Sequence, residues 1–272
     1  MATETVPGAT ESNSAENDIV VTRNGPIMTI LFNRPQRRNA MTWAMYERLA
    51  RACDEVDADD SIRVLVLRGA GGKSFVAGTD ISQFTAFETK EDGLKYEREG
   101  EQRGGRVEKV RKPVLACIEG FAVGGGFAMA AACDIRICTP DSKFGLPIAR
   151  TLGNCLNIGA YSRLVDLMGP SRAKEMIFMA RLLSAEEAKA IGFVAEIVEP
   201  DKIEARVYEM AETIASHAPL TIYATKEMIR RVQEHRRATG GEDIIELVYG
   251  SEDFREGVRA FLEKRKPNWK NR

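Results

Sequence analysis

The chain has 272 residues, enough for one large domain or two small ones with a sizeable core. Its hydrophobic content of 44% and charged content of 29% are typical of a soluble globular protein. Because the formal net charge is -1, no overall basic field favours nucleic acid or a membrane surface as a partner. No apolar run is long enough to span a bilayer, so we expect no membrane segment.

The start of the chain and the cysteines indicate the compartment. Residues 1–17 are polar and lack the basic and apolar regions of a secretory signal, so we expect a disordered tail. The five cysteines form no Cys-x-x-Cys pair, which favours free thiols in the reducing cytoplasm. The chain has only two histidines and neither neighbours a cysteine, so we expect no metal site.

The pattern of predicted elements indicates an α/β fold. Two β-branched runs flank Asn24-Gly25, which predicts a hairpin. A helix follows with Thr42 as its N-cap, and then come buried strands at 62–68 and within 110–120 and 133–140. "GGGFAMAAAC" lies between the last two strands and predicts a short buried helix. This alternation favours a largely parallel sheet over residues 18–200, whereas helices dominate 201–272.

Gly124, Gly125 and Gly126 raise the question of what approaches the backbone there. Neither phosphate-binding spacing of glycines is present, which leaves close helix packing or an oxyanion site. In "SFVAGTDISQF", Thr79 lies at a similar exit from a strand, and two such turns can present their amides to one oxygen. Asp80 is expected to cap the helix that follows it.

The sequence resembles the crotonase (enoyl-CoA hydratase/isomerase) superfamily from about residue 19 to residue 269. The motifs that carry the resemblance are "LFNRPQRRNAM", "SFVAGTDI", "IEGFAVGGGFAMAAACDIRI", "SKFGLP", "GPSRAKEMIFMARLLSAEEAKAIGFVAEIV" and "DFREGVRAFLEKRKPNW". The resemblance implies repeated ββα units around a core sheet and a helical C-terminal region that makes trimer contacts. It also implies a homotrimer or a dimer of trimers.

The same resemblance implies an acyl-CoA thioester as substrate, with no metal and no cofactor besides the CoA of the substrate. The backbone amides of Thr79 and Gly125 would then form an oxyanion hole for the thioester oxygen. Other residues that the resemblance places along the acyl-CoA are Arg37, Arg38, Ala77, Gly78, Asp80, Ile81, Gly124, Lys264 and Lys266. Phe254 and Phe261 are expected in the core rather than against the adenine.

The sequence departs from the family at the two glutamates with which hydratases move protons. Aligned on the glycines and on "FGLP", these positions hold Ala128 and Ile148, and neither side chain can accept a proton. Candidates for other polar roles are Asn154 and Cys155. A helix N-terminus would lower the pKa of the Cys155 thiol, and the alternative is a buried structural cysteine. Carboxylates that could act from the opposite wall are Glu97, Glu99 and Glu101, whereas Glu119 is expected to point elsewhere.

Two hypotheses follow. In the first, the protein is an enzyme that stabilises a thioester enolate, by resemblance a hydratase or isomerase but with weak classical hydration. Thioester hydrolysis, decarboxylation or another enolate reaction would then suit the residues present. In the second, it is a non-catalytic subunit that binds acyl-CoA.

Overall fold

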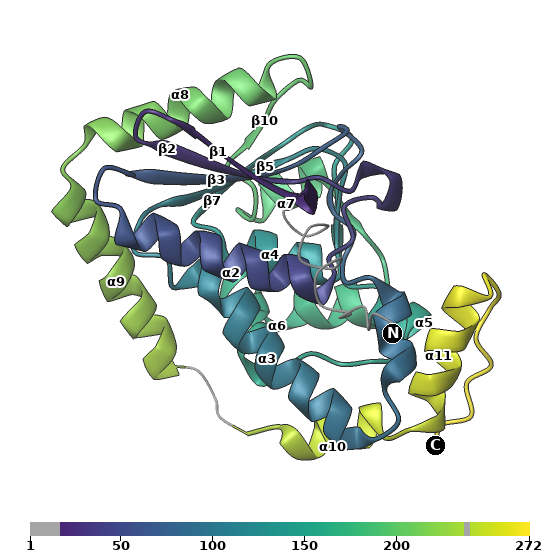
Figure 1. Ribbon diagram of the computed structural model, residues 1–272. Coiled ribbons are helices and arrows are strands. Elements are labelled where there is room, and N and C mark those ends of the chain that lie inside the picture. The colour runs from purple at the N-terminus through teal and green to yellow at the C-terminus, as the bar shows by residue number, and fades with distance from the viewer. Residues whose placement is uncertain (1–16, 237–239) are drawn as a thin grey trace, which may run out of the picture.

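The computed structural model describes residues 17–236 and 240–272, excluding the side chains of residues 101–104 (Figure 1). Of the predicted disordered tail, only Asn17 lies within the described residues. The strands are β1 (Ile19–Asn24), β2 (Ile27–Phe32), β3 (Val64–Gly69), β4 (Ser74–Val76), β5 (Val114–Ile118), β6 (Phe121–Val123), β7 (Ile135–Cys138), β8 (Lys143–Gly145), β9 (Leu183–Ser184) and β10 (Glu196–Ile197).

The helices in the first two thirds of the chain alternate with these strands. They are the 3-10 helices η1 (Pro35–Arg37) and η2 (Ile81–Ala86), and α2 (Trp43–Ala58), α3 (Lys90–Glu108), α4 (Gly125–Ala132), α5 (Ile148–Thr151), α6 (Ile158–Phe178) and α7 (Ala185–Ala190). The remaining helices are α8 (Ile203–Ser216), α9 (Pro219–Arg236), α10 (Glu242–Tyr249) and α11 (Glu252–Leu262). No described helix combines the length and the apolar character that crossing a membrane requires.

The described strands form two sheets. The larger has the order β1-β2-β3-β5-β7-β10, in which only the β1–β2 pair is antiparallel. That pair is the predicted hairpin, and Gly25 takes the positive φ of 55° that its turn requires. The smaller sheet has the order β4-β6-β8-β9, and its first three strands are parallel.

Successive pairs of strands alternate between the two sheets and are each followed by helices. β3 and β4 lead through η2 to α3, β5 and β6 lead to α4, and β7 and β8 lead to α5 and α6. These are the repeated ββα units that the resemblance implied, so the predicted fold is confirmed. Because every unit has the same order, the turns that follow β4, β6 and β8 come together at one edge of the small sheet.

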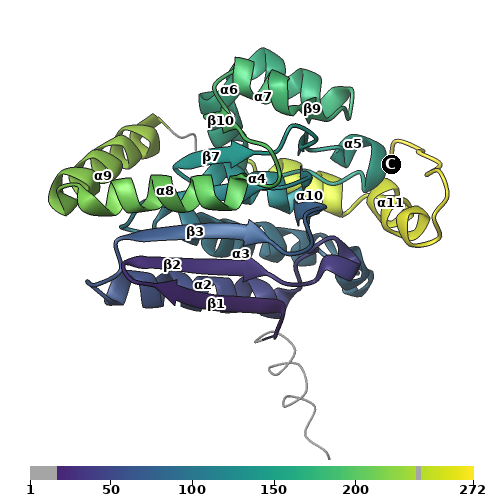
Figure 2. The same ribbon diagram turned by 90° about the horizontal axis from the view of Figure 1, so that it is seen from above.

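The large sheet is covered on both faces (Figure 2). α8 packs against one face through an apolar cluster that includes Val66, Ile137 and Val207. The main core lies on the other face, where α2 packs against β1 and β2, and α4 packs between the small-sheet strands β4 and β6 and helix α6. Thr42 caps α2 as predicted, its hydroxyl accepting a hydrogen bond from the Met45 amide at 3.2 Å.

The C-terminal helices α10 and α11 fold back over α3 and η2 of the same chain. Their contact is a cluster of aromatic rings in which Phe254 lies 6.2 Å from Phe84 and 4.7 Å from Tyr249 between ring centroids. Phe254 is therefore in the core, as predicted. Close approach of α3 and α10 requires glycine at residue 93, where a Cβ would lie 2.2 Å from the Tyr249 ring.

Candidate active site

A cavity of about 550 Å³ opens where the turns after β4, β6 and β8 meet. Its walls come from α2, η2 and α3 on one side and from α4, α5 and the start of α6 on the other. The exposed Arg37 and Arg38 line the cavity and mark its mouth. The further predicted ligand-contacting residues that border the cavity are Ala77, Gly78, Thr79, Asp80, Ile81, Gly124 and Gly125.

The three consecutive glycines serve three different purposes. Gly124 takes a positive φ of 58°, which ends β6 in the sharp turn that starts α4. A Cβ on Gly126 would lie 1.9 Å from the Val76 carbonyl oxygen, so this residue allows close helix packing. Gly125 lines the cavity, where a Cβ would lie 2.7 Å from the Tyr46 hydroxyl.

The structure brings the amides of Thr79 and Gly125 together. A Cβ on Gly125 would lie 3.6 Å from the Thr79 nitrogen, and one on Gly78 would lie 3.6 Å from the Gly125 nitrogen. Within the described part of the chain, neither amide donates a hydrogen bond to another protein group. Gly125 is also the first residue of α4, so its N–H lies at the positive end of the helix dipole. The two amides can therefore both donate to one oxygen atom in the cavity.

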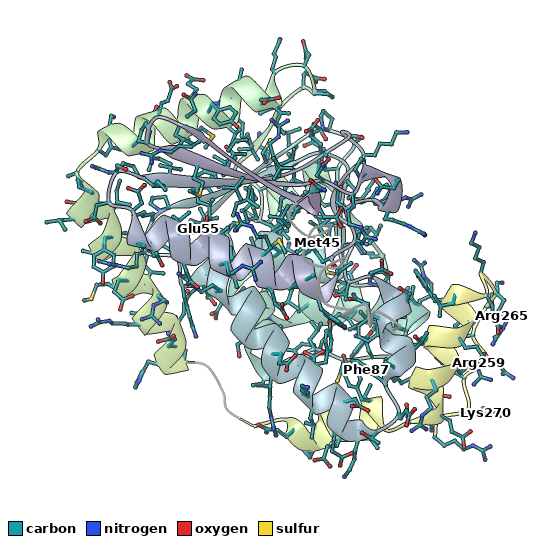
Figure 3. The ribbon with its side chains drawn as sticks, viewed as in Figure 1. Met45, Glu55, Phe87, Arg259, Arg265 and Lys270 are labelled. Carbon is teal, nitrogen blue, oxygen red and sulfur yellow. The ribbon has the colours of Figure 1, made fainter. Side chains whose placement is uncertain are left out.

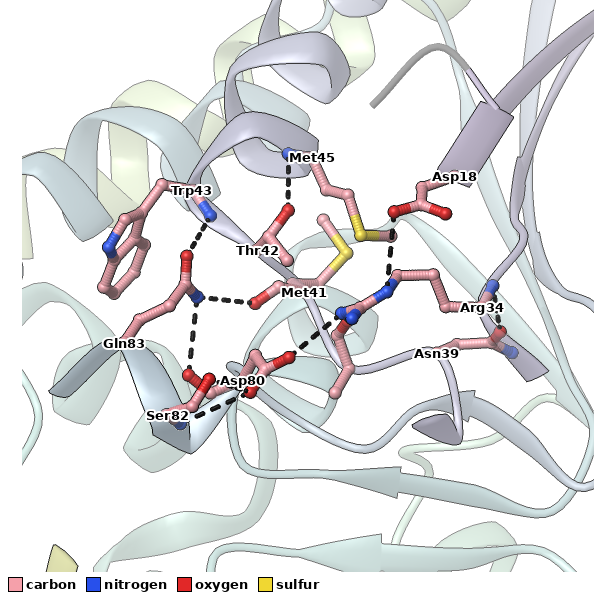
Figure 4. A network of polar contacts seen from close by, with 11 residues as sticks. Asp18, Arg34, Asn39, Met41, Thr42, Trp43, Met45, Asp80, Ser82 and Gln83 are labelled. Atoms are coloured by element: carbon pink, nitrogen blue, oxygen red, sulfur yellow. Dashed lines mark hydrogen bonds and ion pairs between the residues drawn. The ribbon is translucent and has the colours of Figure 1, made fainter. Parts of the chain in front are cut away.

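Backbone pairing holds the Thr79 turn in this position, and Figure 4 shows the Gln83 amide donating to the Met41 and Asp80 carbonyls beside it. The Met41 amide donates to the Gly78 carbonyl at 2.8 Å, and the Asp80 amide donates to the Met41 carbonyl at 2.8 Å. The Thr79 amide between them is left facing away from this pairing. Asp80 also caps η2 as predicted, since its side chain accepts a hydrogen bond from the Ser82 amide.

Arg34 links the Thr79 turn to the residue before β1. It forms ion pairs with Asp80 at 3.2 Å and with Asp18 at 3.4 Å (Figure 4). Burial raises the pKa of Asp80, but hydrogen bonds from Ser82 and Arg34 outweigh this effect and the net pKa is lowered. Asp80 is therefore an ionised structural carboxylate at neutral pH and does not serve as a proton donor.

The two positions that the sequence comparison with the family predicts for the hydratase glutamates lie on the cavity wall. Ala128 is half-buried one turn into α4, and Ile148 is 6% exposed at the start of α5. Among the described residues that line the cavity, only Asp80 and Glu97 carry carboxylates. The described wall beside the two amides is therefore aliphatic at Ala128 and Ile148.

Glu97 reaches the cavity from α3 and is held by groups from two other helical segments. It accepts hydrogen bonds from the Tyr249 hydroxyl at 2.6 Å and from the Asn157 amide at 2.8 Å. Asn157 in turn caps α6. Since donors occupy both carboxylate oxygens, Glu97 joins α3, α6 and α10 and is a poor candidate for a base.

The other candidate carboxylates do not lie on the described wall of this cavity. Glu99 pairs with Lys95 at 3.9 Å, and Glu101 lies outside the described side chains. Glu119 lies in a second cavity with Arg68, 3.7 Å away, so it points elsewhere as expected.

Asn154 lines the cavity, whereas Cys155 does not belong to its described wall. The Asn154 Oδ1 atom is buried with no hydrogen-bond partner in the described structure. Cys155 is 7% exposed in the apolar cluster of Phe254, and α6 begins three residues later at Ile158. Burial raises the pKa of the Cys155 thiol to about 12, so of the two interpretations the buried structural cysteine is confirmed and the lowered pKa is wrong.

All five cysteines are free and buried, and burial raises the pKa of each thiol to about 12. An unfolded thiol ionises near 8.5, so at higher pH the unfolded chain binds fewer protons than the folded one. We expect the free energy of unfolding to fall from about pH 9 upward, by about 1.4 kcal/mol per pH unit for each thiol. Denaturant titrations at pH 8 and pH 10 with a reducing agent test this; equal stability at both would contradict it.

The C-terminal basic residues lie away from the described cavity. Lys264 and Lys266 follow α11, are exposed and form no part of the wall as far as it is described. Figure 3 places Arg259, Arg265 and Lys270 on the outer side of this region. Phe261 is 48% exposed and borders the cavity, so its predicted place in the core is wrong: α11 turns this ring toward the mouth.

A group of aromatic and hydroxyl side chains on the cavity wall was not predicted from the sequence. Trp43, Tyr46, Phe84 and Tyr96 all line it. The sequence indicated their place only through spacing along the predicted helices. Tyr46, for example, lies one turn after the Thr42 cap, on the side of α2 that faces the Thr79 turn. Because aromatic residues at such spacing usually belong to the core, the pattern alone could not separate the two roles.

Repeated ββα units with two adjacent amide-presenting turns define the crotonase class of proteins. The family model described as enoyl-CoA hydratase/isomerase matches residues 22–272, and the chain belongs to this family. It is 35% identical to the short-chain-enoyl-CoA hydratase of Clostridium acetobutylicum, over 94% of this chain and 99% of the relative. It is 34% identical to the carnitinyl-CoA dehydratase of Salmonella typhi, over 93% and 98% of the two chains.

Solved structures of related proteins superimpose over nearly the whole chain. A methylmalonyl-CoA decarboxylase in complex with 2-nitronate-propionyl-CoA matches with a TM-score of 0.85 at 31% identity, covering 93% of this chain and 98% of that one. An enoyl-CoA hydratase/carnithine racemase from Magnetospirillum magneticum matches with a TM-score of 0.77 at 34% identity, covering 94% and 96%.

Proposed function

We propose that the protein processes an acyl-CoA thioester and stabilises its enolate form between the amides of Thr79 and Gly125. The observation that carries this proposal is that two amides converge on one point of the cavity, and neither donates a hydrogen bond to another group of the described structure. Two such donors, held in place before the reaction, stabilise negative charge as it develops on the oxygen. The names of the relatives, all of which are acyl-CoA enzymes, support the choice of ligand.

The rest of the acyl-CoA would run toward the mouth of the cavity. Arg37 and Arg38 lie there, and their charges suit the phosphates of CoA. Lys264 and Lys266 would reach the CoA of another subunit in a homotrimer or dimer of trimers. The proposed function needs no metal and no cofactor beyond this CoA, and the cytoplasm is the compartment that we propose.

The aliphatic wall limits the kinds of reaction that this site could catalyse. Forming an enolate by removing a proton requires a base, and Ala128 and Ile148 supply none. Loss of CO₂ from a 2-carboxyacyl thioester forms the same enolate without a base, because the electrons of the breaking C–C bond move to the thioester oxygen. We therefore propose decarboxylation of a 2-carboxyacyl-CoA. The TM-score of 0.85 with a methylmalonyl-CoA decarboxylase supports this choice.

Assays of the purified protein with methylmalonyl-CoA, malonyl-CoA and crotonyl-CoA test the proposal. We expect CO₂ release from at least one carboxylated thioester. We expect hydration of crotonyl-CoA to be slower than in a hydratase with both glutamates by a factor of about 10² or more, because a positioned acid and base contribute at least this much. Free CoA as the main product would indicate hydrolysis, and binding of every thioester without any product would support a non-catalytic subunit. Either result would contradict decarboxylation.

A further inference from the structure

Three hydroxyl groups from separate elements meet beside the two amides. The Tyr46 hydroxyl, from α2, lies 3.0 Å from Thr79 Oγ1. The Tyr96 hydroxyl, from α3, lies 3.2 Å from the same Thr79 Oγ1. All three residues line the cavity. Thr79 thus presents its amide to the proposed oxyanion and its side chain to a chain of hydrogen-bonded hydroxyls.

The Tyr46 hydroxyl is the member of this chain that reaches Gly125. The point 2.7 Å from the Tyr46 oxygen, where a Gly125 Cβ would lie, is also 3.4 Å from Thr79 Oγ1 and 3.6 Å from the Thr79 nitrogen. A thioester oxygen bound by the Thr79 and Gly125 amides would lie close to this point. The α-carbon, which is bonded to the same carbonyl carbon as this oxygen, would lie within the space that the Tyr46 hydroxyl borders.

Neighbouring aromatic rings fix the two phenols in place. Trp43 stacks on Tyr46 with a centroid distance of 6.4 Å and an interplanar angle of 28°. Trp43 also packs against Tyr96 at 5.3 Å, and Phe84 meets the Tyr96 ring edge-on at 5.0 Å. Rings packed in this way cannot swing freely, so the hydroxyl groups are held in position before a ligand binds.

We propose that Tyr46 donates the proton that converts the enolate into product. This inference rests on the proposed function. The C–C bond to the substrate carboxylate breaks, CO₂ leaves, and the electron pair moves to the thioester oxygen held by Thr79 and Gly125. The enolate then takes the Tyr46 proton at its α-carbon and restores the carbonyl. The Tyr46 phenolate regains a proton through Thr79 Oγ1 and Tyr96 from water.

A phenol suits this step better than a carboxylate does. Phenols keep their proton at neutral pH, whereas carboxylates lose it, so a phenol acts as an acid without first competing as a base. The described wall has tyrosine hydroxyls, and other groups hold both of its carboxylates, Asp80 and Glu97, so it can quench an enolate but is poor at creating one by proton removal. This selectivity matches the aliphatic residues at positions 128 and 148.

The test compares Tyr46→Phe with the unaltered protein, using methylmalonyl-CoA in D₂O. Phenylalanine keeps the ring that packs on Trp43 and removes only the hydroxyl. We expect kcat to fall by a factor of about 10²–10⁴, the usual contribution of a positioned acid, with little change in KM. The unaltered protein should place deuterium on one face of the α-carbon, and the variant should place it on both. Tyr96→Phe should cause a smaller loss of kcat.

Tyr208→Phe is the matched control, since it removes a tyrosine hydroxyl that bonds a threonine, Thr29, at 2.9 Å outside this cavity. It should leave kcat and the deuterium pattern unchanged. Binding of 2-nitronate-propionyl-CoA, which resembles the enolate, should be retained in Tyr46→Phe. If the variant binds this analogue more weakly by the same factor as kcat falls, Tyr46 is a third donor to the oxygen and the proposal is wrong.

The remaining outcomes separate this inference from the proposed function. Unchanged kcat and one-sided deuterium in Tyr46→Phe overturn the role of Tyr46 and leave decarboxylation standing. No CO₂ release by the unaltered protein overturns both. If the unaltered protein releases CO₂ but places deuterium on both faces of the α-carbon, water protonates the enolate, which also contradicts the inference.

Discussion

Replacing Gly125 by valine is expected to abolish turnover of every acyl-CoA substrate. A Cβ at this position would lie 2.7 Å from the Tyr46 hydroxyl and 3.6 Å from the Thr79 nitrogen, so the side chain would fill the space of the thioester oxygen. Loss of a single oxyanion donor typically costs a factor of about 10²–10³ in kcat, and here both amides become inaccessible. Steady-state rates and calorimetric binding of an acyl-CoA measure the effect.

The control for this variant is Ala205→Val, which places the same branched side chain at an exposed position on α8. It should retain full activity. Circular dichroism must show that Gly125→Val is folded, because position 125 begins a buried helix. A folded Gly125→Val protein with unchanged activity would remove Gly125 from the site.

Introducing glutamate at both predicted acid/base positions, in the double variant Ala128→Glu/Ile148→Glu, is expected to create hydration of crotonyl-CoA. Both positions line the cavity, and the two amides that would polarise the enoyl thioester are already in place. A positioned acid and base typically contribute a factor of about 10²–10⁴, and we expect a gain within this range over the unaltered protein. Loss of crotonyl-CoA absorbance on hydration measures the rate.

The matched control is Ala128→Gln/Ile148→Gln, which introduces side chains of nearly the same size that cannot accept a proton. This variant should gain no hydration. If it hydrates crotonyl-CoA as fast as the glutamate variant does, the gain comes from reshaping the cavity. If the folded glutamate variant binds crotonyl-CoA but gains nothing, the alignment of these two positions is wrong.

Much of the fold could be predicted because short sequence motifs mark where its strands and helices begin and end. Asn24-Gly25 marks the hairpin turn and Thr42 marks the start of α2, and both act within a few residues of backbone. The small sheet of β4, β6, β8 and β9 was not predicted. Its strands have two or three residues each, too few to show an alternating pattern, and long-range pairing alone defines them.

The candidate site divides in the same way. The turns of Thr79 and Gly125 could be found because each follows a strand and contains glycine, so the backbone itself carries the signal. The Tyr46 and Tyr96 hydroxyls could not, since α2 and α3 bring them together only through tertiary packing. The lowered pKa of the Cys155 thiol was a wrong prediction for a related reason. Cys155 precedes α6 but lies among apolar rings, so burial decides its pKa.

The central claim is that the two amides bind the thioester oxygen, and infrared spectroscopy of a bound thioester tests it most directly. An acyl-CoA labelled with ¹³C at its carbonyl gives a separate stretching band when it is bound to the protein. Hydrogen bonds from Thr79 and Gly125 should polarise this carbonyl and move its band to lower frequency than in water, and Gly125→Val should lose the shift. A bound carbonyl band at its frequency in water, in the unaltered protein, would contradict the account.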